Sequence, residues 1–264
     1  MEILIVGVGA MGSLFSKHLR VHHEVSVYDI DPKRVEELSR RSGLKPKWEL
    51  RDLSSFDAAL VCTPISEIPR VLRELSKEMR KSSLIMEISS VKSPVIDSMR
   101  QLRELGFTGI SFHPLFGPGI RDLSSGRAAL VEVSDLEEEI SLLSSLFPFE
   151  IIPMSLEDHD RAMAWLALIH LISNAFLSSS DDSADLLMRV RTPTISQFLR
   201  IALSTLTQSE RLSQEMISLN PYFEECLRTF SSELSSKNFG EIRREIRRWL
   251  DLMSPEEAYS SLYD

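Results

Sequence analysis

The first 154 residues alternate between short apolar runs and segments with helical spacing, and this alternation is the strongest constraint on the fold. Many residues of the apolar runs are β-branched, which favours strands. We expect strands at Ile3–Val6, Val25–Tyr28, Ala58–Val61, Leu84–Ile88, Ile110–Phe112, Ala129–Val133 and Glu150–Ile152. Continuous apolar strands separated by helices predict a mostly parallel sheet that is covered on both faces.

The strand pattern ends at Pro153, and only helical patterns follow. We expect helices over residues 157–177, 193–217 and 220–250. The sequence therefore predicts an α/β domain over residues 1–154 and an all-α domain over residues 155–264. Apolar residues lie on more than one side of the pattern that starts at Pro193, which leaves two alternatives, a homodimer through the helical domain and a packed monomeric bundle.

Composition narrows the classes of function. The chain has 264 residues, 43% hydrophobic and 26% charged, with a net charge of −9, as in ordinary globular proteins. The arginine pairs at 243–244 and 247–248 share one amphipathic pattern with glutamates, which predicts a solvated face and no nucleic-acid site. Cys62 and Cys226 are too few for a disulfide framework or a zinc site, so we expect reduced thiols and no metal. We found no signal-peptide pattern and no uninterrupted apolar run of the ~20 residues that cross a membrane, so we expect a cytoplasmic protein.

A glycine-rich loop, Gly7-Val8-Gly9-Ala10-Met11-Gly12, directly follows the first predicted strand and opens a helical pattern. In this setting the spacing of the glycines predicts a dinucleotide site and a Rossmann-type domain. Gly7 permits a tight turn, Gly9 lets the backbone approach a pyrophosphate, and Gly12 allows close packing of helix and strand. The backbone N–H groups at Ala10 and Met11 begin the helix and would face the phosphates.

The second predicted strand ends at Asp29, seventeen residues beyond the last glycine of the loop. A carboxylate there can accept the ribose hydroxyls and repels a 2′-phosphate, which favours NAD over NADP. Lys33 and Arg34 lie close enough to keep NADP open. Thr63 follows the strand over residues 58–61 and would face the same crevice, although an ordinary loop residue explains it equally well.

Two further strands end in side chains that suit catalysis. Ser90 and Lys92 follow the strand over residues 84–88, where Ser93 and Pro94 could also be the N-cap and first residue of a helix. His113 ends the next strand and precedes a turn rich in Pro and Gly. A histidine at a strand end beside an exposed turn suits proton transfer at neutral pH.

In combination these motifs resemble the prephenate dehydrogenases, and the resemblance covers nearly the whole chain. Its motifs are the glycine loop, Ser-Val-Lys at 90–92, His-Pro-Leu-Phe-Gly-Pro at 113–118, the segment 157–163, Thr192-Pro193 and Leu219-Asn220-Pro221. The resemblance implies NAD-dependent oxidative decarboxylation of prephenate to 4-hydroxyphenylpyruvate, in tyrosine biosynthesis. It implies that His113 is the base for the 4-hydroxyl, that Ser90 orients this hydroxyl and His113, and that Lys92 helps to hold a carboxylate.

The helical half departs from the family pattern. The family's second helical histidine is expected twelve residues after His159, whereas His170 lies eleven after it, so a substrate contact and a buried core histidine are equal alternatives. We interpret His159 itself as a residue of the helix start and not as a catalyst. Ser204 stands where the family has a carboxylate-binding arginine. Arg200, one turn earlier, could replace that arginine or be a surface residue.

Two other functions fit the same motifs. An arogenate dehydrogenase would carry them too, because arogenate has an amino group where prephenate has a keto group. A non-catalytic NAD-binding regulator would explain Ser204 and the displaced histidine. The joint presence of Ser90, Lys92 and His113 favours an enzyme, because a regulator needs none of the three.

Overall fold

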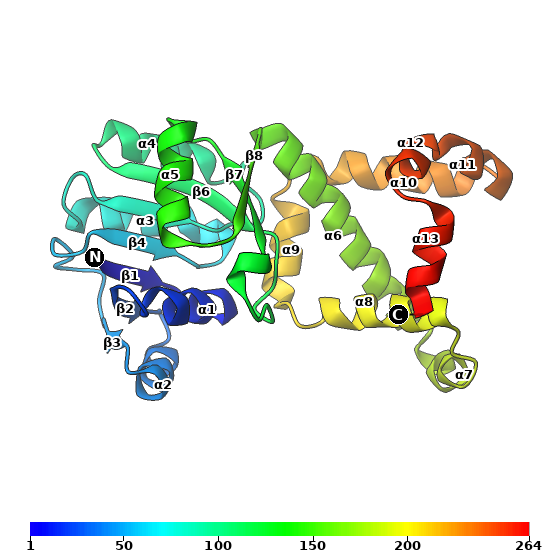
Figure 1. Cartoon of the computed structure of the whole chain (residues 1–264), viewed down its shortest axis with the longest axis horizontal. Helices are drawn as coiled ribbons and strands as arrows, with labels where there is room; N and C mark the ends of the chain where they lie inside the picture. The colour runs from blue at the N-terminus through cyan, green and yellow to red at the C-terminus, as the bar shows by residue number, and fades with distance from the viewer. Residues whose placement is uncertain (264) are drawn as a thin grey trace. The chain divides into compact units, whose positions relative to one another are not determined.

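The computed structural model describes residues 1–263 and contains one eight-stranded sheet with helices packed on it (Figure 1). The strand order is β3-β2-β1-β4-β5-β6-β7-β8. The β6–β7 pair is antiparallel and β8 is parallel to β7, so β7 and β8 run opposite to the other six strands. The strands are β1 (Glu2–Val6), β2 (Glu24–Tyr28), β3 (Lys45–Pro46), β4 (Ala58–Val61), β5 (Leu84–Glu87), β6 (Thr108–Pro114), β7 (Arg127–Val131) and β8 (Glu150–Met154). The predicted fold class is confirmed.

The sequence pattern did not predict β3, and it predicted a shorter strand than the observed β6. β3 has only two residues, both exposed, so it carries no hydrophobic pattern. β6 extends to Pro114 and pairs His113 with Ala129 of β7. His113 therefore lies within a buried strand, one residue earlier than the turn that we expected it to adjoin.

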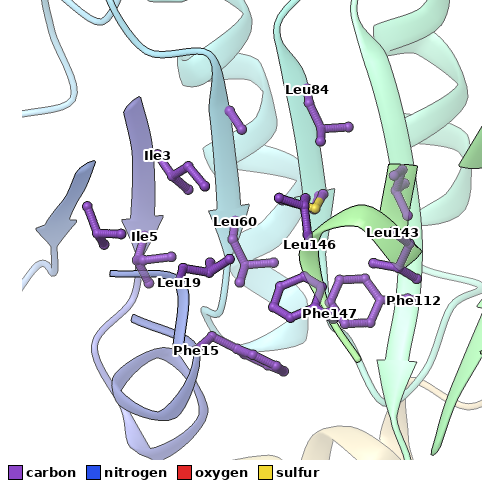
Figure 2. Close-up of a cluster of buried hydrophobic side chains, with 14 of the residues drawn as sticks. Ile3, Ile5, Phe15, Leu19, Leu60, Leu84, Phe112, Leu143, Leu146 and Phe147 are labelled. Carbon is purple, nitrogen blue, oxygen red and sulfur yellow. The ribbon is translucent and has the colours of Figure 1, made fainter. Parts of the chain in front are cut away.

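One face of the sheet packs against α1 (Ala10–Leu19) and α5 (Leu136–Leu146) through a cluster of buried apolar side chains (Figure 2). The ring centroids of Phe15 and Phe147 are 5.2 Å apart, and those of Phe147 and Phe112 are 5.7 Å apart. Fully burying an apolar side chain of this size contributes about 1.5–3 kcal/mol. Because Phe112 belongs to this cluster, the core anchors the strand residue that immediately precedes His113.

Helices α2 (Pro32–Ser42), α3 (Ile68–Glu78) and α4 (Ile96–Glu104) complete the α/β part. The chain divides into two compact units, 1–160 and 161–264, at a point inside the long helix α6 (Leu156–Ser179). The predicted junction lay at residues 154 and 155. The difference arises because His159 and Asp160, in the first turn of α6, contact His113 and Lys92 of the α/β unit.

The second unit is helical, but its helices are shorter than the pattern predicted. They are α6, α7 (Ala184–Arg189), α8 (Pro193–Thr205), α9 (Glu210–Ser218), α10 (Phe223–Ser236), α11 (Phe239–Glu245), α12 (Arg247–Leu252) and α13 (Pro255–Ser260). Ser209 begins a new helix because its side chain accepts a hydrogen bond from the N–H of Leu212. Asn238 likewise forms a capping box with Glu241, so apolar periodicity alone overestimated the helix lengths.

Helix α6 is long and apolar enough to cross a membrane, by length and composition only, with a mean hydropathy of 1.4. Polar residues interrupt its apolar ones, so its sequence contains no uninterrupted apolar run long enough to span one. In the second unit α6 packs on α8: the rings of Phe176 and Phe198 lie 4.8 Å apart, and Asn174 donates a hydrogen bond to Thr205. These contacts pack part of α6 against α8 within this unit.

Candidate active site

The predicted site residues of the α/β unit lie at one edge of the sheet. The glycine loop follows β1, Asp29 follows β2, Thr63 follows β4 and Ser90 follows β5. His113 is the penultimate residue of β6, which is parallel to β5. Because these strands are parallel, their carboxyl ends share one edge, which is where ligands bind in open α/β sheets.

The glycine loop fits a bound pyrophosphate. Gly7 has a φ of +95°, and a Cβ added to it would lie 2.6 Å from the carbonyl oxygen of Cys62. A Cβ at Gly12 would lie 1.9 Å from the carbonyl oxygen of Gly7. A Cβ at Gly9 would meet no atom of the described residues within 4 Å. Two glycines are thus required by packing, and the third leaves open space at the N-terminus of α1, as a phosphate needs.

Asp29 is held against the glycine loop. Its Oδ2 accepts the N–H of Val8 at 2.8 Å, and its Oδ1 accepts the N–H of Asp31 at 2.9 Å. Each oxygen keeps lone-pair capacity for a ribose hydroxyl. Thr63 is half-buried, and its hydroxyl has no hydrogen-bond partner within residues 1–263. A buried polar atom without a partner is the feature that a ligand on this edge would satisfy.

His113 is buried and its imidazole is held neutral. Its Nδ1 lies 3.2 Å from Nε2 of His159, and the two rings meet edge to face. Burial lowers the pKa of His113 well below its usual value, and the nearby His159 and Lys92 lower it further. At neutral pH the side chain is therefore an unprotonated base.

His159 and Asp160 tie the first turn of α6 to the loop after β5. Both side chains are fully buried, and Nδ1 of His159 lies 2.7 Å from Oδ1 of Asp160. Asp160 also accepts hydrogen bonds from the N–H of Lys92 at 2.9 Å and the N–H of Ser93 at 2.8 Å. His159 lies in the first turn of α6, as expected, and its ring also contacts His113. These two histidines are 46 residues apart, so no local pattern indicates their contact.

Lys92 does not face open space. Its ammonium is fully buried, 2.6 Å from Oε1 of Glu87 and 2.8 Å from the carbonyl oxygen of Phe112. Glu87 also accepts hydrogen bonds from the N–H of Ser89 and the hydroxyl of Ser111. In this structure Lys92 neutralises Glu87, which differs from the carboxylate-binding role that the resemblance implies. Burying an ammonium requires such an anionic partner, and Glu87 lies hidden in an otherwise apolar strand.

Ser90 lies in a bend after β5 and is half-buried. The alternative in which Ser93 and Pro94 open a helix is wrong, because α4 begins at Ile96 with Val95 at its N-cap. The side chain of Ser93 instead donates to Asp160 at 2.5 Å. The loop over residues 89–95 is therefore held by α6 as well as by the sheet.

The remaining candidates belong to the second unit. His170 is half-buried on α6, and its Nδ1 has no hydrogen-bond partner among the described residues. Arg200 is exposed on α8. Ser204 donates to the carbonyl oxygen of Ile201 in its own helix, at 2.7 Å. Over residues 1–263 no group of three or more His, Cys, Asp or Glu side chains could hold a metal ion.

Comparisons with known proteins show which proteins the chain is similar to. Residues 15–133 match the family model of the prephenate dehydrogenase nucleotide-binding domain. A probable arogenate/prephenate dehydrogenase of Methanocaldococcus jannaschii is 22% identical over 245 residues, which cover 87% of this chain and 54% of the relative. Both matches show that the chain is similar to the prephenate/arogenate dehydrogenase family. It spans about half the length of that curated relative.

Solved members of the prephenate/arogenate dehydrogenase family share the fold over almost the entire chain. Prephenate dehydrogenase from Aquifex aeolicus, in complex with hydroxyphenyl propionate and NAD⁺, superposes with a TM-score of 0.74 at 18% identity, covering 100% of this chain and 98% of that one. Arogenate dehydrogenase from Synechocystis superposes with a TM-score of 0.62 at 21% identity, covering 94% and 97%. The family's two substrates are thus both represented among proteins of this fold.

Proposed function

We propose that this chain is an NAD-dependent dehydrogenase that converts prephenate to 4-hydroxyphenylpyruvate and CO₂. The observation that carries the proposal is the neutral, buried His113 at the same sheet edge as the open glycine loop. Further support comes from the similar Aquifex aeolicus enzyme, which was solved with NAD⁺ and a hydroxyphenyl compound. The position of Asp29 favours NAD over NADP, because a 2′-phosphate would meet its carboxylate.

In the proposed reaction His113 moves one proton. NAD⁺, held by residues 7–12 and Asp29, supplies the acceptor for the hydride that leaves ring carbon 4. His113 takes the proton of the 4-hydroxyl as a carbonyl forms at that carbon, and Ser90 orients the hydroxyl. Loss of CO₂ places the electron pair of the broken C–C bond in the ring, and His113 returns its proton to the phenolate oxygen. Prephenate and NAD⁺ thus balance 4-hydroxyphenylpyruvate, CO₂ and NADH.

The test is an assay of the purified chain with prephenate and each cofactor, following NADH absorbance and CO₂ release. We expect turnover with NAD⁺ and a lower kcat/KM with NADP⁺. A parallel assay with arogenate decides between the two substrates by their kcat/KM values. NAD⁺ binding in calorimetry with no NADH formed from either substrate would contradict the proposal and support the non-catalytic regulator.

Arg200 is the candidate for the substrate's side-chain carboxylate. We expect Arg200→Ala to raise KM for prephenate about tenfold or more with little change in kcat, because an ion pair to the bound substrate is lost in ground and transition states alike. The measurement is steady-state kinetics at saturating NAD⁺. Arg228→Ala, which changes another exposed arginine on α10, is the matched control. An unchanged KM in Arg200→Ala would show that Arg200 is a surface residue.

We also propose a homodimer through the helical unit, in the cytoplasm, where the free Cys62 and Cys226 stay reduced. Large apolar side chains are exposed on α6 and α8, and Trp165, Ile169, Ile201 and Leu203 are each 47–54% exposed. Exposed apolar groups in this number are typical of an interface. We expect sedimentation equilibrium to give twice the chain mass, whereas the mass of one chain would favour the monomeric bundle.

A further inference from the structure

Three buried side chains form a continuous hydrogen-bonded series at the carboxyl end of β6. Asp160 contacts Nδ1 of His159 at 2.7 Å, and Nε2 of His159 contacts Nδ1 of His113 at 3.2 Å. Asp160 and His159 are 0% exposed and His113 is 8% exposed. The series links a helix start to a strand end, and all of it lies within the α/β unit.

The partners of Asp160 determine where the protons of this series lie. Its carboxylate accepts the N–H groups of Lys92 and Ser93 and the hydroxyl of Ser93. Burial raises the pKa of Asp160, but the hydrogen bonds from His159, Lys92 and Ser93 outweigh this and lower it. Asp160 is therefore an ionised acceptor at neutral pH and accepts the Nδ1 proton of His159.

The tautomer of each imidazole follows in turn. A neutral imidazole carries one proton, so His159 with its proton on Nδ1 has a lone pair on Nε2. That lone pair accepts a proton from Nδ1 of His113. His113 must then carry its own proton on Nδ1, which leaves its Nε2 with a free lone pair. This free nitrogen is the one able to take a proton from a substrate.

We propose that Asp160 and His159 are positioning residues that select the tautomer of His113 and receive part of its positive charge during turnover. This inference rests on the proposed function and deepens it. When Nε2 of His113 takes the hydroxyl proton, the Nδ1 proton can pass to Nε2 of His159, and the return of the proton reverses both transfers. No proton is gained or lost by the series as a whole.

The surrounding charges favour this direction of transfer. Burial lowers the pKa of His159, and its hydrogen bond to Asp160 raises it. Lys92 opposes a positive charge on both histidines, but its ammonium is paired with Glu87. His159 is the imidazole in direct contact with a carboxylate, so a positive charge is better stabilised there than on His113.

The first test reads the tautomer directly and needs no substrate. NMR of the wild-type chain, isotope-labelled at histidine nitrogens, should show His113 protonated at Nδ1 and unprotonated at Nε2. The same measurement on His159→Leu should show this preference reduced, because the acceptor for Nδ1 is gone. A wild-type His113 protonated at Nε2 would overturn the proposal.

The second test separates positioning from folding and from substrate binding. We expect His159→Leu to lower kcat about tenfold or more, with KM for prephenate and NAD⁺ affinity within about twofold. His159→Gln, whose side-chain oxygen can still accept from His113, should restore part of kcat. His22→Leu, an exposed histidine, should leave all three quantities unchanged. A kcat for His159→Leu within twofold of wild type would contradict the proposal.

The two proposals can fail separately. If prephenate is not oxidised but His113 has the expected tautomer, the positioning pair stands and the proposed substrate is wrong. If prephenate is oxidised but His113 is protonated at Nε2, the proposed substrate stands and the positioning role of Asp160 and His159 is wrong. If His159→Leu does not fold, the wild-type spectrum and the kcat of His159→Gln still test the proposal. The proposal requires the expected tautomer of His113 and a kcat for His159→Gln measurably below that of the wild type.

Discussion

Replacing His113 by asparagine is expected to lower kcat for prephenate oxidation by about 10²–10⁴-fold, the usual contribution of a general base. Asparagine has no basic nitrogen, but it is small enough for the buried strand position and its amide can still donate to Nε2 of His159. The fold and the glycine loop should therefore be preserved. Steady-state kinetics measure the loss, and calorimetry should show unchanged NAD⁺ affinity.

The exposed His22→Asn is the matched control and should keep full activity. The pH dependence of the wild type gives a second check. Because burial lowers the pKa of His113, the base stays unprotonated as the pH falls through the usual histidine range near about 6.5. Activity should then fall only at a clearly lower pH, where His113 becomes protonated. High turnover in His113→Asn would contradict the assignment of His113 as the base.

Replacing Lys92 by methionine is expected to destabilise the chain by about 3–5 kcal/mol, as breaking a buried ion pair from one side does. The change leaves the carboxylate of Glu87 fully buried with hydrogen-bond donors but without a countercharge. Methionine matches the length of the lysine stem, so the loss reports charge more than packing. Urea unfolding followed by circular dichroism measures the free energy of unfolding.

Two variants give this prediction its controls. The double change Lys92→Met with Glu87→Gln should recover most of the stability, because no unpaired charge remains. Lys45→Met removes an ion pair with Glu24 of nearly equal N–O distance, 2.5 Å, but with both side chains more than 60% exposed. It should leave the free energy of unfolding nearly unchanged, because solvent screens an exposed pair. If Lys92→Met were equally mild and instead raised KM for prephenate, Lys92 would be the substrate-binding cation that the resemblance implies.

Local sequence signals predicted the fold well because each depends on neighbouring residues. Apolar runs separated by helical spacing predicted the parallel sheet, since strands buried on both faces must be continuously apolar. The loop over residues 7–12 predicted the nucleotide-binding turn, because the packing around Gly7 and Gly12 excludes any side chain. Helix lengths were predicted less well, because a single capping residue such as Ser209 can start a new helix within a continuous apolar pattern.

The interior of the candidate site could be predicted only in part. Ser90, Lys92 and His113 stood out because reactive side chains follow apolar strands. Their partners did not: Glu87 lies within an apolar run, and His159 and Asp160 belong to a helix in the part of the chain that we expected to fold separately.

The sequence by itself determined the parallel sheet, the glycine loop for a dinucleotide and the presence of a histidine at the end of β6. Only the tertiary structure decided that Lys92 is neutralised by Glu87 and that His113 is backed by His159 and Asp160. The physical reason is that burial makes every charge and proton depend on its spatial neighbours. His159 lies 46 residues from His113 along the chain, beyond the reach of any local pattern, and Glu87 is hidden within an apolar strand.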